Sequence, residues 1–172
     1  MNERGNSIVL IGFMGAGKSS AGRALARMTG LPRFDTDELI TKRFGLSIPE
    51  IFAEHGEHAF RESESQTLRQ LADQGPAIIV TGGGAILSSA NRKLLRRLGR
   101  VVLLSADDET LFARISKRSM RPLLQTENPR ATAAELMRDR LPLYREAADA
   151  EVDTTLLKHD EVARKILDLV QS

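Results

Sequence analysis

The sequence predicts an α/β protein in which helices cover both faces of a parallel β-sheet. Short apolar runs rich in Val, Ile and Leu alternate with longer segments of helical periodicity along all 172 residues. The first run leads through a glycine-rich turn into a helix, and no repeat, low-complexity tract or linker divides the chain. We therefore expect one domain, residues 1–172, whose ligands bind beyond the carboxyl ends of the strands.

Five strands and six helical segments follow from these patterns. The strands are expected at 7–11, 31–35, 77–81, 100–104 and 150–153. The helices are expected at 20–28, 38–74, 91–98, 107–117, 131–148 and 160–170. Gly30 should end the first helix, and Gly45 and Gly56 should break the longest helical segment. Pro142 should bend its helix, because proline cannot donate the backbone hydrogen bond that a helix interior needs.

The turn after the first strand is typical of a phosphate-binding loop. Residues 12–19 read Gly-Phe-Met-Gly-Ala-Gly-Lys-Ser, which fits the pattern G-x-x-x-x-G-K-S. The glycines let the backbone curl around a phosphate, and the N-terminal N–H groups of the next helix point at the same anion. Lys18 is expected to reach the β- and γ-phosphates, and the Ser19 hydroxyl to ligate Mg²⁺. A chance glycine turn is the alternative, but the flanking strand and helix favour a nucleoside triphosphate site.

The composition argues against several other classes. The chain is 41% hydrophobic and 28% charged, and its net charge of +2 is too small to indicate nucleic acid as a partner. It has no Cys, which excludes disulfides and thiol nucleophiles and favours a reducing compartment. Residues 8–26 superficially resemble a signal peptide, but Lys18 and Arg23 interrupt them, and no run reaches the ~18 apolar residues of a membrane span. We expect a cytoplasmic monomer that does not contact a membrane.

Two carboxylates, Asp35 and Asp37, follow the second expected strand. If the chain stays extended there, both point the same way. One could then hold the magnesium shell while the other accepts a proton from a substrate hydroxyl. Either could instead cap the next helix, as Asp107 or Asp108 can cap the helix at 107–117. Beside a phosphate loop the catalytic interpretation is favoured, because phosphoryl transfer needs a carboxylate near the metal.

Other candidates have a structural interpretation of similar weight. Arg61 can pair on a helix surface with Glu57 or Glu64, and Arg140 can be an ordinary surface charge. The triple glycine at 82–84 allows a ligand to approach the backbone, but a tight strand-to-helix turn would use it too. These residues gain a functional meaning only in combination.

A basic segment, residues 118–130, contains two prolines and no apolar period, so it is expected to be a loop. It carries Arg118, Arg121 and Arg130, and it could fold over a triphosphate and place Arg121 on the transferring group. It could equally be a solvated loop. His55 and His58 lie three residues apart on a helix, but no further ligand completes a metal site, so we treat them as surface residues.

Taken together, these motifs resemble the shikimate kinases. The shared elements occur in family order and cover nearly the whole chain: residues 12–19, 35–37, 60–61, 82–84, 121–124 and 140–144. The phosphate loop is shared with many kinases, whereas the Asp-Thr-Asp, triple-glycine and Arg-x-Pro-Leu-Tyr elements are far more specific. The resemblance implies a P-loop NTPase fold of the nucleoside-monophosphate-kinase type, with a five-stranded parallel sheet in the order 2-3-1-4-5 and a mobile lid at about 118–130. It implies transfer of the γ-phosphoryl group of ATP to the 3-hydroxyl of shikimate.

For the nucleotide, the resemblance implies that the phosphates contact residues of the loop and the start of the following helix. These are Gly15, Ala16, Gly17, Lys18, Ser19 and Ser20, with Arg114 flanking the adenine and Arg121 reaching ATP from the lid. One Mg²⁺ ion would be held by Ser19 and, through water, by Asp35.

For the acceptor, the resemblance implies that Asp37 binds the shikimate hydroxyls and acts as the base. Arg61, Arg140 and the backbone of Gly82, Gly83 and Gly84 would hold the rest of shikimate, with Glu64 orienting Arg61. Arginine forks suit the single carboxylate of such a ring. Lys18, Asp37 and Arg121 would be the catalytic residues.

The chain departs from the family pattern near the adenine, where Leu156, Leu157, Lys158 and His159 stand in place of an arginine or proline. A gluconate or nucleotide kinase of the same architecture is the nearest alternative function. A nucleotide-binding module without catalysis is a second, but the Asn-Lys-x-Asp tetrapeptide of GTPases is absent and both Lys18 and Asp37 are present.

Overall fold

A computed structural model describes residues 4–118 and 124–172 of the chain. Within them, five parallel strands form one sheet in the order β2-β3-β1-β4-β5, which confirms the predicted order 2-3-1-4-5. The strands are β1 (Ser7–Ile11), β2 (Arg33–Asp35), β3 (Ile78–Val80), β4 (Gly99–Ser105) and β5 (Ala150–Asp153). All five residues of β1 are buried, as the centre of a sheet covered on both faces requires.

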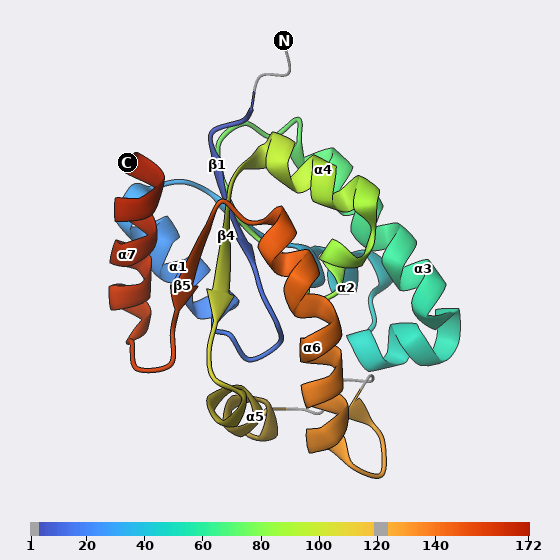
Figure 1. Ribbon diagram of the computed structural model, residues 1–172. Helices are drawn as coiled ribbons and strands as arrows, with labels where there is room; N and C mark the ends of the chain where they lie inside the picture. The colour runs from blue at the N-terminus through green and yellow to red at the C-terminus, as the bar shows by residue number, and fades with distance from the viewer. Residues whose placement is uncertain (1–3, 119–123) are drawn as a thin grey trace.

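Helices cover both faces of this sheet (Figure 1). One face carries α1 (Lys18–Thr29) and α7 (His159–Gln171), which pack against each other. The other face carries α3 (Ile48–Leu71), α4 (Ser89–Leu98) and α6 (Pro129–Ala147), with the short α2 (Thr36–Phe44) beside α3. The core between the layers is aliphatic, with residues such as Val9, Leu25 and Ile79 fully buried. The predicted three-layer architecture is therefore confirmed.

Most helix boundaries follow the local signals. Gly30 and Gly45 end α1 and α2 with left-handed φ angles of 73° and 66°. Gly56 interrupts α3 with φ 84° and ψ 164°, and Asp107 rather than Asp108 caps α5 (Asp108–Ser116) by accepting from the Thr110 N–H. These breaks were predicted from residue type alone.

One local difference concerns α6. It begins at Pro129, two residues before the expected start, and Pro142 lies inside it without ending it. Proline suits the first turn of a helix because its missing N–H would be unpaired there in any case. Arg130 consequently belongs to a helix and not to the expected loop. Residues 119–123, including Arg121, lie outside the described part of the chain.

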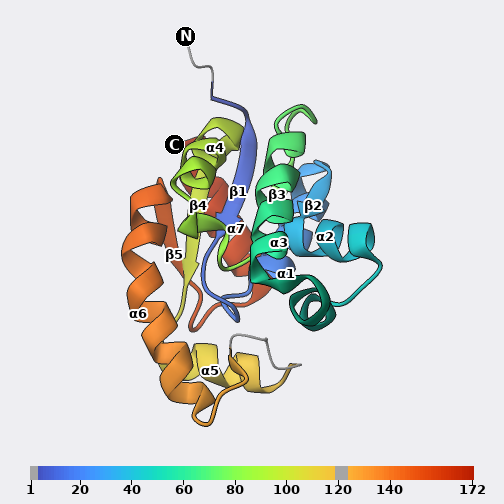
Figure 2. The ribbon, with the colours of Figure 1, turned by 90° about the vertical axis from the view of Figure 1, so that its right-hand side faces the viewer.

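All strand carboxyl ends meet at one end of the molecule, where α5 and the first turns of α6 also lie (Figure 2). The phosphate loop, the Asp35–Asp37 segment and the triple glycine follow β1, β2 and β3 at this end. In residues 4–118 and 124–172, no helix combines the length and the apolar character that a bilayer crossing needs.

Candidate active site

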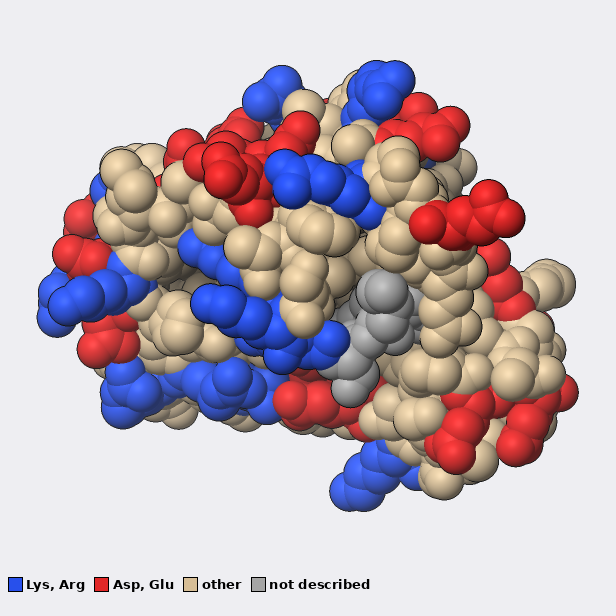
Figure 3. All heavy atoms as spheres, turned by 90° about the horizontal axis from the view of Figure 1, so that it is seen from below, with Lys and Arg blue, Asp and Glu red and all other residues tan. Residues whose placement is uncertain are grey.

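An open pocket lies at the carboxyl ends of the strands. Figure 3 looks onto this end and shows Lys and Arg side chains gathered near its middle, with many Asp and Glu side chains toward the rim. We call the pocket at the carboxyl ends of the strands the central pocket. It is lined by residues of the phosphate loop (Met14, Gly15, Gly17, Lys18, Ser19), by Asp35 and Asp37, by Ile48, Phe52, Phe60, Arg61 and Glu64, by Thr81 to Gly84, and by Arg118 and Arg140.

The phosphate loop takes a backbone shape that depends on glycine. Gly15 and Gly17 have φ angles of 83° and 91°, a region that other residues rarely adopt. Lys18 is the first residue of α1, and its Nζ donates to the carbonyls of Gly12 at 2.6 Å and Phe13 at 3.0 Å. The ammonium group is thereby held inside the curl of the loop, where an incoming phosphate can reach it.

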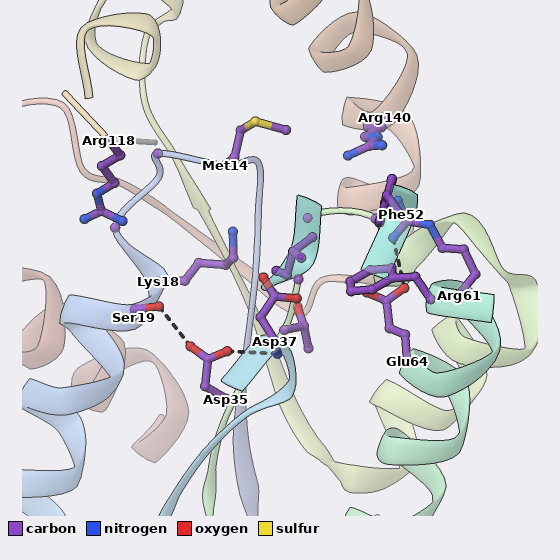
Figure 4. A pocket seen from close by; sticks show the side chains of 18 residues that line it. Met14, Lys18, Ser19, Asp35, Asp37, Phe52, Arg61, Glu64, Arg118 and Arg140 are labelled. Atoms are coloured by element: carbon purple, nitrogen blue, oxygen red, sulfur yellow. Dashed lines mark hydrogen bonds and ion pairs between the residues drawn. The ribbon is translucent and has the colours of Figure 1, made fainter. Parts of the chain in front are cut away.

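Asp35 serves two neighbours at once (Figure 4). Its Oδ1 caps α2 by accepting from the N–H groups of Asp37 at 3.0 Å and Glu38 at 3.3 Å. Its Oδ2 accepts from the Ser19 hydroxyl at 2.9 Å. The capping hypothesis and the metal-site hypothesis are thus compatible, because each uses a different oxygen. Two oxygen donors side by side are the ligands that Mg²⁺ prefers.

Asp37 does not continue an extended chain, as the sequence prediction assumed, because α2 already begins at Thr36. It lies in the first turn of α2 and still lines the central pocket. Gly82 faces it so closely that a Cβ there would lie 2.7 Å from Asp37 Oδ1 and 3.0 Å from Glu64 Oε2. Asp37, Glu64 and the triple glycine therefore meet at one point.

Arg61 has both of the partners considered from the sequence. Its guanidinium bonds Glu64 at 3.1 Å and Glu57 at 3.3 Å, and it lines the central pocket as well (Figure 4). Glu64 is fully buried, and its Oε2 has no hydrogen-bond partner among the described residues. Burial raises the pKa of Glu64, Arg61 and Arg140 lower it, and Asp37 raises it, which together bring the pKa to about 7. Arg61 therefore forms ion pairs along its helix and also lines the central pocket.

Arg140 is buried, with 4% of its surface exposed, and is no surface charge. It lines the central pocket from α6, one helical turn before Tyr144. The Tyr144 hydroxyl donates to the Gly83 carbonyl, and Tyr144 also bonds Arg140. This network joins α6 to the triple glycine, so the positions of the backbone and of the guanidinium are linked.

A second hollow adjoins the central pocket on the side of α5, and both contain Gly15, Gly17 and Arg118. We call it the adjoining pocket. Arg114 lines it and donates to the Gly15 carbonyl at 3.2 Å. Ala16, Ser20, Leu157 and His159 also line it, whereas Leu156 is 93% exposed and points elsewhere. The predicted phosphate and adenine residues therefore follow a path from one pocket to the other.

Other residues considered from the sequence lie outside the site. The Arg130 guanidinium lies over the Phe112 ring at 5.3 Å, outside both pockets. The His55 ring packs against Phe44, and within the described ranges no three His, Asp or Glu side chains cluster as a metal site.

Sequence reasoning missed Phe52, Ile48 and Thr154. Phe52 packs against Phe60 at 5.1 Å and lines the pocket, but its helical spacing is the same as that of a core residue. Thr154 sits in the adjoining pocket, and no motif singles out a lone threonine after a short strand.

Comparison with known proteins supports one family. The model of the family described as "Shikimate kinase" matches residues 14–171. The shikimate kinase of Thioalkalivibrio sulfidiphilus is 50% identical over 87% of this chain and 78% of that protein, and the one of Thermodesulfovibrio yellowstonii is 42% identical over 94% and 92%. The structure of Acinetobacter baumannii shikimate kinase in complex with shikimate superimposes with a TM-score of 0.93 at 39% identity, covering 98% of this chain and 94% of that one. A gluconokinase from Sinorhizobium meliloti shares only the fold, with a TM-score of 0.59 at 19% identity, covering 98% and 93% of the two chains.

Proposed function

This chain belongs to the shikimate kinase family and is an ATP-dependent kinase, and we propose how its residues transfer the γ-phosphoryl group of ATP to the 3-hydroxyl of shikimate. The products are shikimate 3-phosphate and ADP, in the biosynthesis of aromatic amino acids. The observation that carries the residue assignment is the convergence of Asp37, Arg61 and Arg140 on one pocket beside the phosphate loop. A ring with one carboxylate and several hydroxyls needs this combination of two cations and one acceptor.

Residues 15–20 bind the ATP phosphates, and Lys18 leaves the loop carbonyls to contact the β- and γ-phosphates. Ser19 and, through water, Asp35 hold one Mg²⁺ ion, and the 2.9 Å contact between their oxygens is compatible with that role. When bound, the ion offsets the negative charge of the phosphates. Arg114 flanks the adenine in the adjoining pocket.

Asp37 accepts the proton of the shikimate 3-hydroxyl as the oxygen attacks the γ-phosphorus. Its position is suited to this because it lies in the same pocket as Lys18. Arg121 is assigned to the lid predicted from the sequence before α6, where it contacts ATP and stabilises the charge of the transferred group. This assignment rests on the sequence motif that begins at residue 121.

Arg61 and Arg140 bind the shikimate carboxylate, and the backbone of Gly82, Gly83 and Gly84 closes around the ring. The pair between Arg61 and Glu64 supports this role because it holds the guanidinium at the pocket wall. A charge-assisted hydrogen bond contributes about 1.5–3 kcal/mol, so loss of either arginine should weaken shikimate binding about tenfold or more.

Shikimate and ATP are the proposed partners, without nucleic acid or a membrane, and the chain is proposed to act as a cytoplasmic monomer that forms one kinase domain over residues 1–172. The absence of Cys supports a reducing compartment such as the cytoplasm, and the small net charge argues against nucleic acid as a partner.

A coupled assay with ATP, Mg²⁺ and each acceptor in turn tests the function. We expect ADP release with shikimate and none above background with gluconate or AMP. Turnover of gluconate or AMP without turnover of shikimate would reject the assignment.

A further inference from the structure

The Thr154 side chain is the meeting point of three segments that are far apart in sequence. It follows β5 directly and is buried, with 3% of its surface exposed. Its hydroxyl lies 3.1 Å from the Ala16 carbonyl in the phosphate loop and 3.0 Å from the Ser105 carbonyl at the end of β4. It also accepts from Arg114 Nη1 at 3.0 Å. A hydroxyl has one hydrogen to donate and accepts through its lone pairs, so both capacities of Thr154 are in use.

Arg114 depends on the same residue for its orientation. Its Nη1 donates to Thr154 Oγ1 and to the Gly15 carbonyl, and its Nη2 donates to the Thr154 carbonyl at 3.1 Å. These three hydrogen bonds occupy N–H groups of a guanidinium that has five in all. Two of the three contacts are with Thr154. The guanidinium is left with its flat face as the part best able to contact a base, since arginine stacks on planar rings.

The neighbouring Thr155 shows that this arrangement is specific to one position. The Thr155 hydroxyl donates to Asp153 Oδ1 at 2.6 Å and accepts from the Asp107 N–H at 3.0 Å. Those groups belong to the exposed start of α5 and the end of β5, and none belongs to the phosphate loop. Two adjacent threonines of one loop thus face different partners.

We propose that Thr154 is a positioning residue for the nucleotide, which fixes Arg114 and the phosphate loop to the same point of the sheet. The inference rests on the proposed place of the adenine beside Arg114. A single hydroxyl sets the distance between the guanidinium at the adenine and the N–H groups at the phosphates. The guanidinium and the loop N–H groups are then held at the spacing that ATP needs before it binds, so fewer protein groups have to be ordered on binding.

The test is Thr154→Val, which keeps the shape of the side chain and removes the hydroxyl. We expect the KM for ATP to rise about tenfold or more, the loss of one hydrogen bond to a charged group, while kcat and the KM for shikimate stay within about twofold. Thr154→Ser restores the hydroxyl and should restore the KM for ATP. Thr155→Val is the matched control and should leave all three constants unchanged.

Arg114→Ala separates this inference from the proposed function. We expect it to raise the KM for ATP, and the double variant Thr154→Val/Arg114→Ala to raise it by less than the product of the two single effects, because the two side chains share one contact. If Arg114→Ala raises the KM but Thr154→Val does not, the positioning role is wrong and the nucleotide site stands. An unchanged KM in Arg114→Ala would instead reject the proposed place of the adenine beside Arg114. If Thr154→Val raises both KM values equally, or if Thr154→Ser fails to rescue, the residue only supports the fold. Should the valine variant not fold, Thr154→Ala with the same serine comparison decides the question.

Discussion

The two halves of the site use different kinds of chemical group. The acceptor half comprises Asp37, Arg61, Glu64, Arg140 and the triple glycine, with Glu64 and Arg140 buried and Asp37 and Arg61 half-buried. The nucleotide half comprises the phosphate loop, Arg114 and Thr154, and most of its contacts use backbone carbonyls or hydroxyls. Both are at the carboxyl ends of the same strands, within one end of the molecule (Figures 2 and 4).

The difference follows from the ligands. A triphosphate is large and highly charged, so main-chain N–H groups and a helix N-terminus can bind it from outside the core. Shikimate is small, so its few groups have to be matched by side chains that are held in place and shielded from water. Substitutions in the acceptor half should therefore change kcat, the KM for shikimate or stability, and leave ATP binding intact.

The largest effect is expected for Asp37→Asn, which removes the proposed proton acceptor and keeps the shape of the side chain. We expect kcat to fall about 10²- to 10⁴-fold while the affinity for ATP stays near wild type. Steady-state kinetics and nucleotide titration measure the two quantities. Glu38→Gln is the control, because Glu38 is exposed and pairs with Arg33 at 2.9 Å. Near-normal turnover of the Asp37 variant would contradict the base assignment.

The next effect concerns stability and pH. Burial raises the pKa of Glu64 from an ordinary 4.5 to about 7, so between these values the folded protein holds a proton that the unfolded chain releases. The contribution of Glu64 to the free energy of unfolding is fully present below about pH 4.5 and is lost as the pH rises to about 7, by on the order of 3 kcal/mol.

Urea unfolding of wild type and Glu64→Gln at several pH values measures this contribution. The difference between the two proteins should change across the window, because glutamine cannot titrate. Glu62→Gln, on the exposed side of the same helix, should track wild type. Parallel curves for wild type and Glu64→Gln would show that the carboxyl of Glu64 titrates at an ordinary pKa.

Gly84→Ala tests how tightly the acceptor half is packed. A Cβ on Gly84 would overlap the guanidinium of Arg61, so the arginine has to move away from the pocket wall. We expect the KM for shikimate to rise about tenfold, the loss of one charge-assisted contact, with the KM for ATP unchanged. An unchanged KM for shikimate in Gly84→Ala would contradict the proposed steric cause.

The smallest effect is expected for Tyr144→Phe. It removes the hydroxyl that donates to the Gly83 carbonyl and leaves that half-buried oxygen without this partner. The cost is about 1 kcal/mol, which corresponds to a fall in Tm of about 2–4 °C for a chain of this size. Thermal unfolding measures it, together with a small rise in the KM for shikimate. A larger change in the KM for ATP than in that for shikimate would argue against the division into two halves.

Much of the fold could be predicted because its signals are local. The buried β-branched strands, Gly30, Gly45 and Gly56 as helix breaks, and the cap near Asp107 each depend on a few neighbouring residues. The expectation of an extended chain from Asp35 to Asp37 was wrong, because the Asp35 side chain starts α2 at once. Pro142, predicted to bend its helix, lies inside α6, where packing against the sheet outweighs one missing hydrogen bond.

The sequence by itself determined the strand order through family resemblance, the phosphate loop through its glycines, and the identity of the charged groups that could bind an acceptor. Only the tertiary structure decided that Arg140 is buried, that Glu64 is desolvated between Arg61 and Asp37, and that Thr154 connects the phosphate loop to Arg114. Backbone shape depends on short-range sterics that a residue type reveals. Burial, pKa and hydrogen-bond partners depend on neighbours that only the folded chain brings together.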